Sequence, residues 1–63
     1  MSTGALLQRR ADAIERAVRS GGSIVASGIL AGERGAVAAA FESSVVVRDW
    51  TEDEWVGLLM KKS

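Results

Sequence analysis

Few residues in this chain are of a type that does chemistry. Histidine, cysteine and tyrosine are absent, so neither a Ser–His nor a Cys–His nucleophile pair can be assembled. The same absence excludes a disulfide and removes the usual ligands of a zinc site. The remaining candidates are serines and carboxylates, chiefly Ser27 and the run Glu52-Asp53-Glu54. Because Ser27 has no histidine base and the usual zinc ligands are absent, we predict no catalytic and no metal-binding residue in this chain.

Ser27 and Gly28 come directly after an apolar run that begins at Ile24. In open α/β sheets, ligands bind outside the carboxyl ends of strands. One interpretation is therefore that Ser27 and Gly28 are the remnant of a pocket wall beside a substrate. The other is that they are only small residues at a corner where a strand turns toward a helix. The sequence leaves both open, since a fold alone does not establish a function.

The charged residues are typical of a solvated surface. Three successive carboxylates at 52–54 point apart at a turn and stay ionised in water. The four arginines of the first 19 residues are offset by Asp12 and Glu15 in the same stretch. Over the whole chain, eight basic residues balance eight acidic ones. We therefore expect no nucleic-acid partner and no attraction to an anionic membrane.

Hydrophobic spacing predicts the elements that must position these residues. Apolar residues recur at helical spacing near the N-terminus and form one stripe. They are Leu7, Ala11, Ile14 and Val18. The expected elements are a helix over 5–19, a strand over 23–28, a helix over 32–42, and strands over 44–50 and 54–61. The first strand has no polar alternation, which is typical of a strand covered on both faces.

The last two strands are expected to form a hairpin, because only a short polar link separates them. The strand at 44–50 carries charges and is suited to a sheet edge, whereas the strand at 54–61 is apolar and suited to the interior. The expected order across the sheet is 23–28, then 54–61, then 44–50. This order makes the two outer strands parallel to each other. We predict an α/β fold with a three-stranded mixed sheet, in the order helix-strand-helix-strand-strand.

This pattern resembles the C-terminal end of class I S-adenosylmethionine (SAM)-dependent methyltransferases, which are Rossmann-like. Within that class it is most similar to the ribosomal-protein lysine methyltransferases that modify large-subunit protein eleven. The resemblance rests on a Gly-Gly turn, an apolar strand, a Ser-Gly-Ile-Leu run, a helix end and a final strand. These are Gly21-Gly22, Ile24-Val25, Ser27-Gly28-Ile29-Leu30, Ala39-Ala40-Phe41 and Glu54-Trp55-Val56-Gly57-Leu58.

The resemblance implies SAM as the cofactor of the parent family, whose binding motifs lie on earlier elements. Gly4 and Gly21-Gly22 do not replace them, because neither follows a strand and opens a helix. We therefore expect a methyltransferase-like C-terminal portion that binds no cofactor alone and is inactive alone. Whether the chain takes part in an enzyme is left open. The alternatives are one half of a split methyltransferase and a small homo-oligomeric interaction module.

The length of 63 residues predicts a single small domain, 1–63, that needs extra stabilisation. Without a disulfide or a metal, a second chain is the remaining means, so we expect a homo-oligomer or a complementing chain. Trp50 and Trp55 are either interface residues or packed within the chain. The residues expected at an interface are Val25, Val46, Trp50, Trp55 and Leu58. The outer edge of strand 23–28 should also be unpaired.

The sequence gives no sign of a membrane segment. The longest apolar stretch, 24–31, is interrupted by a serine and a glycine, and it is far shorter than the ~20 residues that a membrane span needs. The first residues lack the basic flank and apolar run of a signal peptide. These features favour a cytoplasmic location.

Overall fold

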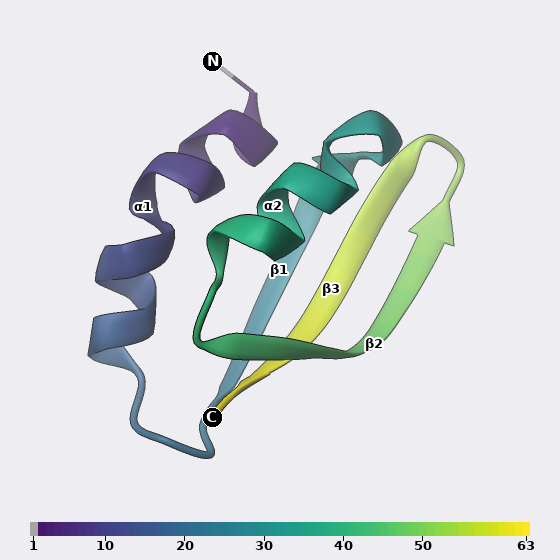
Figure 1. Ribbon diagram of the computed structural model, residues 1–63. Helices are drawn as coiled ribbons and strands as arrows, with labels where there is room; N and C mark the ends of the chain where they lie inside the picture. The colour runs from purple at the N-terminus through teal and green to yellow at the C-terminus, as the bar shows by residue number, and fades with distance from the viewer. Residues whose placement is uncertain (1) are drawn as a thin grey trace.

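The computed structural model describes residues 2–63, which form two helices and one three-stranded sheet (Figure 1). The elements are α1 (Thr3–Ala17), β1 (Ser23–Leu30), the 3-10 turn η1 (Ala31–Glu33), α2 (Arg34–Ala40), β2 (Ser44–Glu52) and β3 (Trp55–Lys62). All five expected elements are present, but the first strand continues past its expected end at Gly28 to Leu30. The second helix is shorter than expected because its first turn, η1, is a 3-10 helix.

The strand order is β1-β3-β2, as the contrast between the charged and the apolar strand predicted. The prediction of a mixed sheet is wrong, because β3 pairs antiparallel with both of its neighbours. The two outer strands do run parallel to each other, but β3 lies between them and they share no hydrogen bonds. The short turn between β2 and β3 places Asp53 at a φ of 55°, in the left-handed region.

α1 begins at a side-chain cap and ends against the last strand. The Oγ of Ser2 accepts a hydrogen bond from the backbone N–H of Ala5 at 3.1 Å, which satisfies one of the free donors of the first turn. At the other end, the Nζ of Lys62 donates to the backbone oxygens of Glu15 and Val18. A cation at the C-terminus of a helix is favourable because the last carbonyls are otherwise unpaired.

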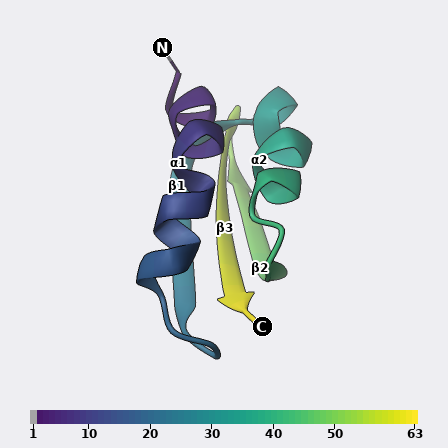
Figure 2. The same cartoon turned by 60° about the vertical axis from the view of Figure 1, so that its left-hand side comes forward.

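Both helices cover the same face of the sheet (Figures 1 and 2). The apolar stripe of α1 is confirmed: Ala11 is buried, and the other three stripe residues pack against the core. The buried core comprises Ala11, Ile24, Ala26, Ile29, Val37, Phe41, Val56, Leu58 and Met60. The prediction that the first strand is covered on both faces is wrong, since buried and exposed residues alternate along most of β1.

α2 contains a glycine that is not required by the fold. Gly35 lies in the first turn of the helix, and a Cβ added there would meet no atom within 4 Å. We expect Gly35→Ala to stabilise the fold by about 0.4–1 kcal/mol, because alanine restricts the unfolded chain without straining the folded one. Urea unfolding followed by circular dichroism measures this change. A loss of stability would show that the space at this position is not free.

Candidate functional site

The carboxyl end of β1 contains an irregularity built from the two predicted pocket-wall residues. Ala26 is paired with Leu58 and Ile29 with Val56, so both Ser27 and Gly28 lie opposite the single residue Gly57. This is a β-bulge, which commonly re-aims side chains at the end of a strand. Gly28 adopts a φ of 73°, a left-handed conformation that costs a residue with a Cβ about 1–2 kcal/mol. Both bulge residues are exposed.

The N-terminus of α1 lies beside this bulge and is fastened there by Glu33. One carboxylate oxygen of Glu33 accepts a hydrogen bond from the hydroxyl of Ser2. The other accepts from the backbone N–H of Leu30 at 3.2 Å. A Cβ at Gly4 would come within 2.6 Å of this carboxylate, so the glycine leaves room for it. Glu33 therefore joins the end of β1 to the start of α1.

The chemistry available at this end of the sheet is limited. Ser27 is the exposed hydroxyl of the bulge, and the chain contains no histidine to act as its base. The carboxylate of Glu33 is already engaged by two donors on either side of it. Among residues 2–63, no group of three or more carboxylates is placed to hold a metal ion. The bulge residues can form part of the wall of a pocket, but this end of the sheet holds no nucleophile with an activating partner.

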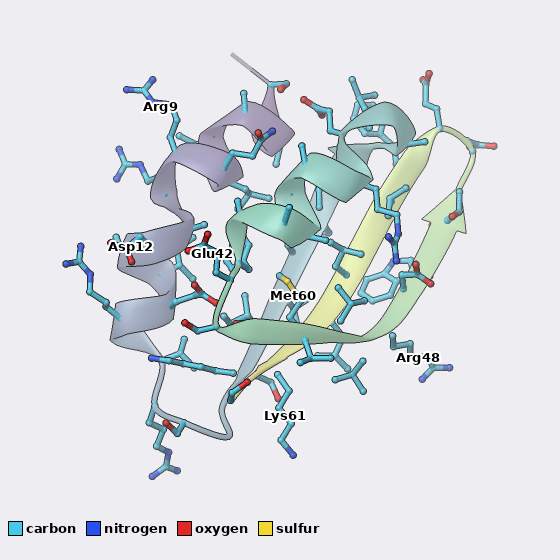
Figure 3. The ribbon with its side chains drawn as sticks, viewed as in Figure 1. Arg9, Asp12, Glu42, Arg48, Met60 and Lys61 are labelled. Atoms are coloured by element: carbon cyan, nitrogen blue, oxygen red, sulfur yellow. The ribbon has the colours of Figure 1, made fainter. Side chains whose placement is uncertain are left out.

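The face of the sheet that no helix covers, here called the open face, is formed by four cross-strand rows. Residues paired across antiparallel strands point to the same side. From the C-terminal end of β3 backwards, the rows are Ser23–Lys61–Val45, Val25–Leu59–Arg48, the bulge with Gly57–Trp50, and Leu30–Trp55–Glu52. Figure 3 shows Met60 pointing under the helices, whereas Arg48 and Lys61 extend away from them.

Three of the five predicted interface residues lie on the open face. Val25, Trp50 and Trp55 are 66%, 43% and 47% exposed. The prediction is wrong for the other two, which lie on the side that the helices cover. Leu58 is fully buried beneath the helices, and Val46 is half-buried on that same side, opposite Met60. Alternation along a strand is the reason, because positions 55 and 58 must point to opposite faces.

Trp50 has a partner within the sheet as well as an exposed surface. Its indole lies directly against Gly57 of the neighbouring strand, in the space that a Cβ would occupy. An aromatic ring over a strand glycine covers backbone that would otherwise face water. Gly57 is buried for this reason, although it lies on the open face. Trp50 is therefore partly packed within the chain, and its role at an interface stays a prediction.

Sequence reasoning missed one buried polar residue. Glu15 is only 5% exposed, and its carboxylate accepts from the backbone N–H of Ser43 at 2.9 Å and the hydroxyl of Ser44 at 2.5 Å. These contacts fasten α1 to the start of β2. Glu15 follows Ala11 by four residues, so helical spacing places it at the margin of the apolar stripe, but a carboxylate at such a margin is ordinarily exposed. Its two serine partners lie 28 and 29 residues away in the sequence, so helical periodicity gives no signal for them.

A model of the family described as ribosomal protein L11 methyltransferase (PrmA) matches residues 4–63. The chain belongs to this family. A search of curated proteins found no match. The match covers every helix and strand after the first residue of α1, so the whole fold described above is a PrmA-family fold. The resemblance seen in the Gly-Gly turn, the Ser-Gly-Ile-Leu run and the final strand is thereby confirmed.

PrmA-family enzymes use SAM, and the residues described here do not fit a SAM site. The strand-to-helix connection within residues 2–63 is the one from β1 into η1 and α2. At this connection the Glu33 carboxylate lies against Ser2 and Gly4, where a glycine-rich loop would leave backbone N–H groups free. We therefore derive no methyl-transfer step from these residues.

No helix among residues 2–63 is long and apolar enough to cross a membrane.

The left-handed conformation of Gly28 gives a direct test of the bulge. We expect Gly28→Ala to destabilise the fold by about 1–2 kcal/mol. The cause is backbone strain and not a clash, because the nearest atoms to an added Cβ are those of Thr3 at 3.9 Å. Gly32→Ala is the matched control, since Gly32 has no atom within 4 Å and no positive φ. Equal urea midpoints for the two variants would contradict the assigned conformation.

Proposed function

We propose that these 63 residues are the sheet-completing C-terminal part of a PrmA-type methyltransferase, which cannot bind SAM or transfer a methyl group by itself. The observation that carries this proposal is the combination of a family match over residues 4–63 with a site that has no nucleophile pair and no SAM-binding loop. The role that remains is structural. The bulge at Ser27 and Gly28 would contribute a wall beside the substrate.

The exposed surfaces support a complementing half. β1 pairs with β3 on one side only, so its other edge carries no strand among residues 2–63. Val25 projects from β1 onto the open face and is mostly exposed. An unpaired edge next to an exposed apolar face is a surface to which another strand and its covering helices can add. The proposal includes a split arrangement, in which the SAM-binding half is on another polypeptide, and a cytoplasmic location.

Complementation tests the proposal. A PrmA-family methyltransferase is truncated before the segment that corresponds to α1, and methyl transfer from SAM to ribosomal protein L11 is measured with and without this chain. We expect the truncated enzyme to be inactive alone and to regain activity when the chain is added. Phe41→Ala, which removes a core side chain, is the control that should not restore activity. Methyl transfer by the 63-residue chain alone would overturn the proposal.

A further inference from the structure

The open face carries opposite charges at its two ends, so one copy of the face is complementary to a second copy turned end for end. One end carries the cation Lys61, with Arg48 in the next row toward the centre. The other end carries Glu52 beside Trp55, with Trp50 in the next row toward the centre. The face therefore runs from a basic end to an end that is acidic and aromatic.

We propose that two copies of this chain pack open face against open face, about a two-fold axis that lies in the interface and crosses the strands. This axis reverses the strand direction and keeps β3 over β3 and β2 over β2. The first row of one copy then faces the fourth row of the other, and the second row faces the third. The proposal concerns the chain by itself and does not rest on its proposed function.

The reversed arrangement places each cation on an aromatic ring. Lys61 of one copy faces Trp55 of the other, and it lies within reach of Glu52. Arg48 of one copy faces Trp50 of the other. A cation over an indole is attracted by the ring, most strongly when water is excluded. Each contact occurs twice because of the two-fold symmetry.

The other face-to-face arrangement is unfavourable. A two-fold axis parallel to the strands would bring each row of β3 onto the same row of the second copy. Lys61 would then face Lys61, and two like charges would be brought together at one end of the interface. The distribution of charge on the open face therefore favours the arrangement in which the strands of the two copies run in opposite directions. The chain has eight basic and eight acidic residues, so no net charge opposes the approach of two copies.

The size of the open face sets the expected strength. Three strands about 4.8 Å apart and about eight residues long span a face of roughly 14 by 26 Å. This is smaller than the ~800 Å² per partner of a standard stable interface. The face nonetheless carries large apolar side chains, among them Val25, Leu59, Trp50 and Trp55. We therefore expect a reversible dimer with a dissociation constant in the micromolar range.

Light scattering on a size-exclusion column measures the mass of the chain over a concentration series. We expect the mass to rise from that of a monomer to that of a dimer through the micromolar range. Trp55→Lys should remain a monomer throughout, because Lys61 of the other copy would then face a second lysine instead of an aromatic ring. Leu6→Lys is the matched control, since Leu6 is 44% exposed but lies on α1, on the opposite side of the molecule. Circular dichroism verifies that both variants are folded.

Charge reversal tests the orientation of the two copies. Lys61→Glu and Glu52→Lys should each weaken the dimer by about tenfold or more, because two attractions become two repulsions. An equimolar mixture of the two variants should restore a dimer, since positions 61 and 52 then carry opposite charges at both symmetry-related contacts. A monomeric wild-type chain at high micromolar concentration would overturn the proposal. Failure of the mixture to associate more tightly than either variant would also overturn it.

Discussion

Phe41→Ala is expected to leave most of the chain unfolded at room temperature. Phe41 is 1% exposed and is the largest of the fully buried side chains. Replacing a buried phenylalanine with alanine costs about 3–5 kcal/mol through lost burial and the cavity that remains. A domain of this size seldom has more than ~3–5 kcal/mol of stability in total. The loss therefore equals the whole stability of the fold.

Far-ultraviolet circular dichroism and urea titration measure this loss. The wild-type chain should show a cooperative transition, whereas Phe41→Ala should show little or none. Leu6→Ala is the control, since it removes an exposed leucine of α1 and should change the midpoint only slightly. A cooperative transition of Phe41→Ala close to that of the wild type would contradict the position of Phe41 in the core.

Glu15→Ala is expected to produce the second largest loss of stability, about 2–3 kcal/mol. The substitution removes an acceptor from the Ser43 backbone N–H and from the Ser44 hydroxyl. Donors that are left without a partner in a partly buried position keep their desolvation cost and lose their bond. The contact between α1 and the start of β2 should loosen first. Urea unfolding gives the size of the loss, and faster amide exchange at Ser43 gives its location.

The matched control is Asp12→Ala, on the same helix one turn earlier. Asp12 forms an ion pair with Arg16 at 3.3 Å, but both side chains are largely exposed. An exposed pair of this kind contributes a few tenths of a kcal/mol. If Asp12→Ala and Glu15→Ala were equally destabilising, the network around Glu15 would not have the role assigned to it.

Local patterns in the sequence were sufficient to predict much of the fold. The apolar stripe of α1, the hairpin of β2 and β3, and the central position of β3 all follow from residues close together in the chain. The strand order was predictable because the charged residues of β2 are tolerated at an edge and the apolar run of β3 is suited to the interior.

The features that were not predicted depend on residues far apart in the sequence. Glu15 is buried because β2 places two serine donors beside it. Glu33 is bound because the N-terminus of α1 returns to the end of β1. The bulge exists because Ser27 and Gly28 of β1 both lie opposite a single residue of β3, Gly57. None of these partners can be identified from periodicity, which describes one element at a time.

The assignment of faces illustrates a second kind of limit. Trp55 and Leu58 were expected on one surface, but strand alternation separates them. Trp55 lies on the open face, and Leu58 lies in the core. Alternation alone could have separated these two positions. It could not have shown which of them faces the helices, because both are apolar and the choice depends on packing against α1 and α2.

Titration of SAM into the purified chain tests the central claim most directly. The claim is that these residues carry the fold of a PrmA-family segment without a SAM site, since the connection after β1 is filled by Glu33 instead of a glycine-rich loop. Isothermal titration calorimetry should show no saturable heat for the folded chain. Saturable binding in the micromolar range would contradict the claim and place a cofactor site within these 63 residues.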